Sequence, residues 1–541
     1  MTIDFLLLIL TFYLILFSIV GYGYQFASIG NLKSDVGFKG LIGIFILIIV
    51  SIISNYFLPH NKIHNSLLII LGLFFFFQNF LKKDLKILLI VSLIFLITIF
   101  LSKNHDDFFY YHLPYELTLI NYSKIIGLGQ LGITGFNTQS SIFYLNSLFY
   151  LPVINLNGMH FGVIFIYLFS TITLLDFILK RIELEKIDVL FYQYLLAITF
   201  FLIFFYRVAE HGTDRSGLLL SYILILLILE SIFISKSVEF FQIFLKILII
   251  LGLTISFKSF FILYFSFLLF LLWVKKEYFI KIRNNIFSNI IFYLFFILCF
   301  LITLTTFLNS GCLIFPLGFT CFEFEWSTPV SYVNHVKDWF ELWSKAGATP
   351  NYRVDNPAIY IQELNWLSNW IKEYFLNKVS DFLVSLTFIS LLFIILFKIK
   401  DIKNLKNEIN SKVIIIYILI FLMFFEWFFN HPTLRYGGYT IIALMFFFPL
   451  GFVLERNKNK QKILRNSFFI IILTFSIFFF RNIDRLYKEY NIYDYNLIKN
   501  PYYRISEESF RVDKEIKNYI KDGTLCRYGT IYVYKKNKLC G

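Results

Sequence analysis

The chain has 541 residues, of which 58% are hydrophobic and 16% charged, and its formal net charge at pH 7 is +14. Soluble proteins average about 45–50% apolar and about 25% charged residues, so this composition excludes an ordinary soluble enzyme. The positive charge lies mostly in lysine-bearing loops, and no basic patch with interleaved aromatic residues stands outside the apolar runs, which excludes nucleic acid as a partner. We therefore expect an all-α polytopic membrane protein.

Apolar runs long enough to cross a bilayer as helices recur throughout the sequence. Since a span needs about 20 apolar residues, we predict about 14 transmembrane helices. They begin near Asp4, Gly37, His64, Asp84, Gly158, Val189, Arg215, Phe240, Ser259, Ile286, Ser380, Lys412, Gly438 and Ser467. The first run lacks the basic start and the small-residue cleavage site of a signal peptide, so we expect a retained helix.

Lysine and arginine are unevenly distributed between alternate loops. One set of loops is rich in both, around residues 82–86, 180–186, 275–283, 398–406 and 456–465. The alternate short loops carry only Lys62, Arg207, Arg215, Lys258 and Arg435. Because positively charged loops stay in the cytoplasm, we expect a multi-pass protein of the bacterial cytoplasmic (inner) membrane with both termini outside.

This topology divides the chain into three parts. Residues 1–83 form N-terminal transmembrane helices, and residues 84–480 form a transmembrane module with outer loops at 102–157 and 309–379. Residues 481–541 form a small outer (periplasmic) tail, expected as a helix and a strand-rich end at Thr524–Tyr534.

Two tryptophan pairs in the second outer loop have helical spacing. Trp339 and Trp343 are four residues apart, as are Trp366 and Trp370, so each pair lies on one helical face. Tryptophan favours the headgroup level of a bilayer, which predicts interfacial helices on the outer leaflet. Packing onto the transmembrane bundle is the alternative.

Four of the five cysteines fall in the expected outer segments. Disulfides persist in oxidising compartments, so Cys312 with Cys321 and Cys526 with Cys540 are expected as local bridges. The alternative is that these thiols are unpaired.

Two adjacent carboxylates, Asp106 and Asp107, follow the fourth predicted helix at its outer end. Like charges this close repel each other, so both stay ionised only beside a cation, a metal or water, and otherwise one pKa rises. Either state suits catalysis, as a base that accepts a hydroxyl proton or as a metal ligand. The simpler alternative is a solvated helix end.

A second cluster fills the short loop Arg207–Arg215 between two apolar helices. Glu210 and Asp214 could share a hard cation with Asp106 or Asp107, and magnesium or manganese prefers such oxygen ligands. Ion pairs with the arginines of the same loop are the alternative. A zinc site is a further alternative, with the ligands His105, His112 and His211.

The third cluster precedes the helix expected at Gly438. Arg435 suits the phosphate of a lipid carrier, because a guanidinium binds phosphate through two parallel hydrogen bonds, and the following Gly437 and Gly438 permit close approach. Lys258, isolated between two apolar runs, could supply a second cation. A side chain that merely snorkels to the membrane surface is the alternative for Lys258.

The order of these clusters resembles the GT-C superfamily of membrane glycosyltransferases, which use polyprenyl-phosphate-linked sugars. The chain is similar in particular to bacterial GT-C-like proteins with a D-D-x-x-Y-x-H pattern, matched here by Asp106, Asp107, Tyr110 and His112. The resemblance covers about Asp84–Gly451. It departs from the usual order in its three leading helices, since the acidic loop of the superfamily follows the first helix.

The resemblance implies a hexosyl or pentosyl transferase of cell-envelope glycan assembly. It implies that Asp106 or Asp107 is the base or metal contact for the acceptor hydroxyl, that Glu210 and Asp214 hold the metal or the donor, and that Arg435 holds the lipid phosphate. We expect His112, His211 and Lys258 beside the substrate. The expected partners are a membrane lipid, the lipid-linked sugar, and an acceptor glycan, lipid or protein.

Two other functions fit a bundle of this size. A transporter or flippase of lipid-linked saccharides would show internal repeats and charges near the membrane midplane, whereas these acids gather at the outer edge. A polymerase or ligase of lipid-linked saccharides would rely on arginines more than on an acid pair.

Overall fold

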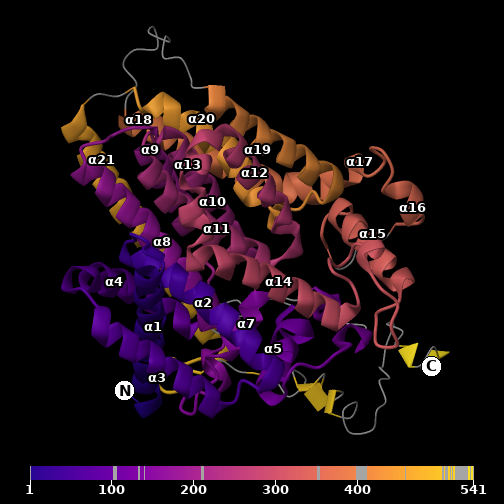
Figure 1. Ribbon diagram of the computed structural model, residues 1–541. Coiled ribbons are helices and arrows are strands. Elements are labelled where there is room, and N and C mark those ends of the chain that lie inside the picture. The colour runs from indigo at the N-terminus through magenta and orange to yellow at the C-terminus, as the bar shows by residue number, and fades with distance from the viewer. Residues whose placement is uncertain are drawn as a thin grey trace.

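The computed structural model describes residues 2–541 except 102–106, 132–133, 139, 209–211, 350–353, 398–410, 457–458, 503–504, 506–509, 512, 515, 518–533, 536–537 and 540–541. Helices dominate these residues (Figure 1). Those of the first half are α1 (Ile3–Ile29), α2 (Val36–Phe57), α3 (Lys62–Asn79), α4 (Lys82–Phe95), η1 (Leu96–Phe100), η2 (Phe108–His112), α5 (Leu113–Asn121), η3 (Leu128–Leu131), α6 (Thr134–Asn137), α7 (Ser141–Ser147), η4 (Leu156–Gly158), α8 (Phe161–Glu183), α9 (Val189–Phe204), α10 (Asp214–Phe233) and α11 (Ser237–Phe257).

The second half of the chain continues the bundle. Its helices are η5 (Ser259–Tyr264), α12 (Phe265–Val274), α13 (Lys276–Phe287), α14 (Ile290–Ser310), η6 (Gly318–Thr320), α15 (Val330–Lys345), α16 (Pro357–Tyr360), α17 (Leu367–Trp370), η7 (Ile371–Val379), α18 (Ser380–Phe397), α19 (Ser411–Asn430), η8 (Leu434–Tyr436), α20 (Gly438–Leu454) and α21 (Lys460–Tyr493). Figure 1 shows α15 and α16 beside the bundle, on the right of the view.

The expected all-α membrane architecture is confirmed in its coarse form, but the count of about fourteen spans is not. In the part of the chain that the structure describes, nine helices are long and apolar enough to cross a membrane. A tenth arises if α12 and α13, bent by 105° at their junction, count as one broken span with η5. Five predicted spans are not among the nine. Helices α4, α9 and α20 have 14, 16 and 17 residues, α12 belongs to the bent pair, and α3 has 18 residues but polar side chains at both ends.

Helix ends that the charge alternation places on one side of the membrane do meet. Arg181 at the end of α8 pairs with Asp188 before α9 and with Glu230 near the end of α10. Lys460 at the start of α21 lies 3.0 Å from Glu185 in the loop after α8. The alternation therefore predicts neighbouring helix ends correctly.

The first three helices pack on one another through close backbone contacts. A Cβ atom added at Gly21 of α1 would lie 1.9 Å from the carbonyl oxygen of Gly72 in α3, and one added at Gly43 of α2 would lie 1.9 Å from that of Ile19. Small residues at such crossings let helices approach closely inside a membrane. Because α2 also packs on α7 and α8, residues 1–83 and the rest of the bundle share one core.

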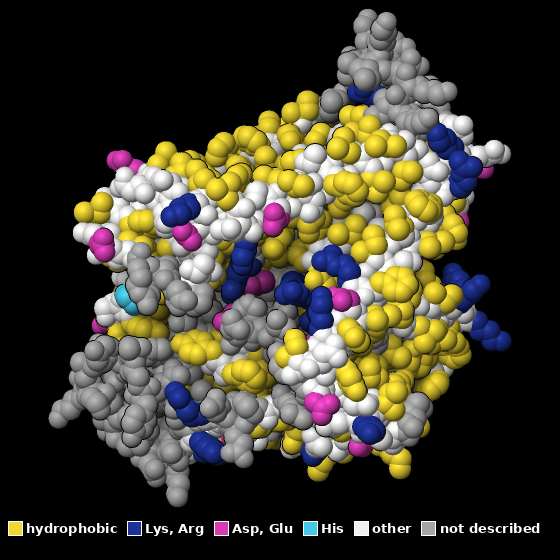
Figure 2. All heavy atoms as spheres, turned by 180° about the vertical axis from the view of Figure 1, so that it is seen from behind, with side chains coloured by type: hydrophobic (Ala, Val, Ile, Leu, Met, Phe, Trp, Pro, Cys, Tyr) yellow, Lys and Arg dark blue, Asp and Glu magenta, His cyan; other side chains and the backbone are white. Residues whose placement is uncertain are grey.

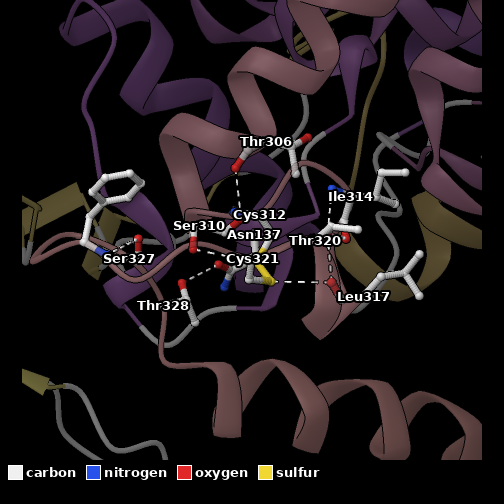
Figure 3. Close-up of a disulfide and its surroundings, with 11 residues drawn as sticks. Asn137, Thr306, Ser310, Cys312, Ile314, Leu317, Thr320, Cys321, Ser327 and Thr328 are labelled. Atoms are coloured by element: carbon white, nitrogen blue, oxygen red, sulfur yellow. Dashed lines mark hydrogen bonds between the residues drawn. A yellow bond between two sulfur atoms is a disulfide. The ribbon is translucent and has the colours of Figure 1, made fainter.

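The two loops that the sequence predicts to be outer pack against each other. Gln130 donates to the carbonyl of Glu325 at 2.8 Å, and Thr328 donates to Asn137 at 2.8 Å. A disulfide joins Cys312 to Cys321, as expected, and closes a short loop beside these contacts (Figure 3). The other expected pair, Cys526 with Cys540, lies outside the described residues.

The two tryptophan pairs have different environments. Trp366 and Trp370 are buried, with their rings 5.4 and 5.7 Å from that of Phe428 in α19, so this pair packs onto the bundle. Trp339 on α15 is 38% exposed and stacks on Trp343. Only the α15 pair is therefore placed to reach a surface.

The tail begins later than expected. Helix α21 continues without a break past Arg481 to Tyr493, where Asp494 takes a left-handed backbone conformation. Further on, β1 (Tyr534–Lys535) pairs antiparallel with β2 (Lys538–Leu539). Most of the expected strand-rich segment Thr524–Tyr534 lies outside the described residues.

Candidate functional site

Four charged side chains that are far apart in the sequence meet at one end of the bundle. Asp107 directly precedes η2, and Asp214 is the first residue of α10. Lys258 directly follows α11, and Arg435 lies in η8. Each side chain lies in a junction at the end of an apolar helix. This position keeps its charge at the border of the bundle.

Ion pairs connect these side chains into a network, the Asp–Lys–Arg cluster (Asp107, Asp214, Lys258, Arg435). Arg435 places Nε 3.0 Å from Oδ2 of Asp214 and Nη2 3.3 Å from Oδ2 of Asp107. Lys258 Nζ pairs with the other oxygen of Asp214. The four side chains are 20–28% exposed, so they are sheltered yet accessible. Their formal charges sum to zero.

Local helix geometry favours this arrangement. A carboxylate at a helix N-terminus and an ammonium at a helix C-terminus each complement the helix dipole, as Asp214 and Lys258 do. Asp107 leads into η2, a π-helix, a rare form that occurs frequently at functional sites. Gly437 has φ +102°, which allows the turn from η8 into α20.

Aromatic side chains border the cluster. The guanidinium carbon of Arg435 lies 5.2 Å from the ring centre of Trp343 and 5.3 Å from that of Tyr436. The ammonium of Lys258 lies 4.7 Å from the Tyr436 ring. Such cation–π contacts help to hold the two cations in place.

Tyr111 adds a hydroxyl group to the cluster. Burial raises the pKa of its phenol, the charges of Asp107 and Asp214 raise it further, and Arg435 opposes them. Burial likewise raises the pKa of Tyr436 to about 12, against the effect of Arg435. Both phenols therefore stay protonated at neutral pH and act as hydrogen-bond donors.

The two cations respond differently to their surroundings. Burial lowers the pKa of Lys258, although Asp214 opposes this shift. Burial also disfavours the charge on Arg435, but Asp214, Tyr436 and Asp107 together raise its pKa. Arg435 is thus the permanent cation of the cluster, and the charge of Lys258 depends on its carboxylate partner.

The predicted site residues are only partly placed. The structure brings together Asp107, Asp214, Lys258 and Arg435, whereas Asp106, Glu210 and His211 lie outside the described residues, as does His105 of the zinc alternative. His112 is 2% exposed and packs edge-on against Tyr111, with their ring centres 4.4 Å apart. It therefore helps to orient the phenol.

The expected magnesium or manganese site requires several oxygen ligands that converge on one point. Among the described residues no three His, Cys, Asp or Glu side chains converge as metal ligands do. Asp107 and Asp214 contact cationic side chains, and the third expected oxygen ligand, Glu210, lies outside the described part. The magnesium or manganese site thus stays a prediction.

The sequence did not indicate the aromatic members as part of this site. Trp343 was singled out only for its helical spacing with Trp339, as part of an interfacial helix. Tyr111 and Tyr436 carry no spacing signal of their own in a chain with 35 Tyr and 71 Phe. Their proximity to charged neighbours in the sequence, as with Tyr436 after Arg435, was the only available indication.

The surface also has a charged hollow. Figure 2 shows Lys and Arg side chains gathered beside Asp and Glu near the middle of one face, in a depression bordered by hydrophobic side chains. A polar headgroup joined to an apolar chain would find both environments on this face.

No curated protein and no solved structure matches the chain. One family model matches residues 5–442, from the first helix to the start of α20. The match therefore includes all four members of the Asp–Lys–Arg cluster and the three leading helices. The chain belongs to the family described as Domain of unknown function (DUF8201).

Proposed function

We propose that this protein is an integral membrane glycosyltransferase, which moves a sugar from a polyprenyl-phosphate donor to an acceptor at the outer face of the cytoplasmic membrane. One observation carries the proposal, namely the meeting of Asp107, Asp214, Lys258 and Arg435 at the ends of apolar helices. The outer location follows from the lysine and arginine alternation of the loops.

The chemistry of transfer needs two kinds of group. The leaving lipid phosphate carries negative charge, which a guanidinium and an ammonium can stabilise, and Arg435 and Lys258 supply both. The attacking hydroxyl needs a carboxylate within hydrogen-bond reach, and Asp107 is the candidate. The neutral phenol of Tyr111 is placed to donate a hydrogen bond to the same substrate.

Binding of the donor would exchange ion partners. Arg435 bonds to both carboxylates, so an arriving phosphate competes with Asp107 and Asp214 for the same donor groups. When the phosphate takes over Arg435, the oxygen of Asp107 becomes available to accept the acceptor's hydroxyl proton. The carboxylate would thus become a base only after the donor is in place.

The described residues need no metal for this scheme. Magnesium or manganese would require Asp107 and Asp214 to exchange their cationic partners for the ion, together with Glu210 as a further oxygen ligand. Such an ion would neutralise phosphate charge in the same way as the two cations. Treatment with a chelator separates the two schemes, because transfer by the cationic side chains alone survives it.

The position of the cluster favours transfer over transport. Asp214, Lys258 and Arg435 lie at helix ends, whereas an alternating-access transporter binds its cargo near the middle of its helices. A carboxylate next to the cations serves no purpose in a site that only holds a phosphate. In a transferase, the carboxylate has a purpose, because it can accept the proton of the acceptor hydroxyl.

The direct test is transfer by the purified full-length protein in proteoliposomes. Labelled polyprenyl-phosphate sugars are supplied as donors with membrane extract as acceptor, and the label is followed into product. We expect Asp107→Asn to reduce transfer at least about a hundredfold, the usual contribution of a general base. Asp381→Asn, which alters an exposed carboxylate of α18, is the matched control and should keep full activity. Equal transfer by Asp107→Asn and the wild type would refute the proposal.

A further inference from the structure

A second cationic site lies where α9 ends beside α21. The guanidinium carbon of Arg481 sits 3.6 Å from the ring centre of Tyr206, and Nη1 of Arg481 donates to the carbonyl of Ile203 at 2.7 Å. The guanidinium carbon of Arg207 lies 5.9 Å from the same ring. One phenol ring thus has two guanidinium groups beside it, and both arginine side chains are exposed.

No carboxylate in the described part of the chain balances the charge of this pair. Among the described residues no carboxylate forms an ion pair with Arg207 or Arg481, in contrast to Arg435 with its two aspartates. Burial would raise the pKa of the Tyr206 phenol, but the two guanidinium groups outweigh it and lower that pKa. Two like charges held this close repel each other, and an anion between them would remove the repulsion.

An apolar cavity opens directly next to this pair. It has a volume of about 410 Å³, within the range of ligand pockets, and it lies between α9, α18 and α21. Ile203, whose carbonyl binds Arg481, is one of its walls, and Ile477 lies one turn before Arg481 on α21. Val384 and Phe388 of the wall are 69% and 67% exposed, so the cavity communicates with the lipid-facing surface.

We infer that this cavity and the pair Arg207–Arg481 form a binding site for an anionic phospholipid of the surrounding bilayer. One acyl chain occupies the cavity between α9, α18 and α21, and the phosphate lies between the two guanidinium groups at the cavity mouth. The site is separate from the Asp–Lys–Arg cluster, and it does not depend on the proposed transfer reaction.

Charge and position identify the phospholipid. A guanidinium pair without a carboxylate partner attracts an anionic headgroup more strongly than a zwitterionic one, whose ammonium would be repelled. Arg207 follows the end of α9, Arg481 lies within α21 beside it, and exposed apolar residues such as Phe480 at 66% cover α21 next to the pair. This is the level at which a phospholipid carries its phosphate next to its acyl chain.

The test uses the purified full-length protein in neutral detergent, with native mass spectrometry of bound lipid. Phosphatidylglycerol, phosphatidylcholine, polyprenyl phosphate and inorganic phosphate are titrated separately. We expect phosphatidylglycerol to bind most tightly, and Arg207→Gln with Arg481→Gln to weaken it about tenfold or more, as expected for lost charge-assisted hydrogen bonds. Arg283→Gln, which changes an exposed arginine on α13, is the matched control and should leave affinity unchanged.

A second variant tests the cavity. Ser385→Phe fills a partly exposed position of its wall, and it should weaken phosphatidylglycerol binding without affecting glycerol phosphate, which lacks a chain. Arg207→Gln alone addresses the case in which the double variant fails to fold, since Arg207 is exposed and makes no backbone hydrogen bond among the described contacts. Unchanged phosphatidylglycerol affinity in these variants would overturn the inference. So would tighter arginine-dependent binding of polyprenyl phosphate, or inorganic phosphate binding as tightly as the lipid.

Discussion

Replacing Asp107 by asparagine should separate substrate binding from transfer. The change removes a negative charge while keeping the size of the side chain and a carbonyl oxygen that can still accept from Arg435. In the wild type an incoming lipid phosphate must compete with Asp107 for Nη2 of Arg435, at 3.3 Å. We therefore expect Asp107→Asn to bind polyprenyl phosphate more tightly, although it transfers sugar far more slowly.

The size of the gain follows from the ion-pair geometry. Two unit charges about 3.3 Å apart attract by about 5 kcal/mol at an effective dielectric constant of about 20, and by about 1 kcal/mol in bulk water. Both side chains are 28% exposed, which places the pair toward the lower value. A net gain of about 1–2 kcal/mol corresponds to about five- to thirtyfold tighter binding.

Affinity is measured by microscale thermophoresis of the purified protein with polyprenyl phosphate that lacks a sugar, so that no turnover occurs. Asp381→Asn is again the control, and its affinity should equal that of the wild type. The difference between Asp107→Asn and the wild type should shrink at high salt, because the competing pair is partly exposed. Weaker or unchanged binding by Asp107→Asn at low salt would refute the exchange of ion partners.

Three further predictions concern stability and the turn that carries Arg435. Loss of the Cys312–Cys321 bridge in Cys312→Ser should cost about 2–3 kcal/mol, the usual effect of opening a short loop, and a lower Tm in detergent would show it. Burial, with a contribution from a neighbouring histidine, lowers the pKa of His60 to about 3, below that of an unfolded histidine. Protonation therefore favours the unfolded state, so the stability of the protein falls as the pH drops from about 6.5 to about 3. His60→Gln should show a flatter profile of Tm against pH over that range. Gly437→Ala should lose about 1–2 kcal/mol and much of its transfer, because alanine disfavours φ +102° and its Cβ would meet Phe260; a wild-type Tm and rate in this variant would contradict the role of the turn.

The sequence identifies all four cluster residues, Asp107 included, by one physical rule. A charge at the end of an apolar helix is costly unless it has a partner or a function, and Asp214, Lys258 and Arg435 all stand in such places. The rule does not say which charges meet, because pairing depends on how the helices pack. Lys258 illustrates this point, since its isolation in the sequence favoured a snorkelling side chain, whereas the folded chain pairs it with Asp214.

The count of about fourteen spans is not confirmed, because several of the apolar runs form helices that are too short or too sharply bent to count as single spans. Hydropathy counts apolar residues and is insensitive to where the helix ends. The apolar run at Asp84 gives α4 of only 14 residues, continued by the 3₁₀ segment η1, and the run at Ser259 gives η5, α12 and a sharp bend into α13.

The balance of charges differs between the pair Arg207–Arg481 and the Asp–Lys–Arg cluster, and this difference bears on the proposed transfer reaction. At the cavity mouth, Arg207 and Arg481 face no described carboxylate, so an anion binds there by simple attraction and leaves nothing reactive behind. In the Asp–Lys–Arg cluster, every cation already holds a carboxylate, so an anion binds only by displacing one. In the proposed transfer reaction, the displaced carboxylate would serve as the base. The lipid phosphate would therefore bind more weakly than it would to the same cations without carboxylate partners. In return, the carboxylate would stay paired while the donor is absent and would become a base only when the donor binds.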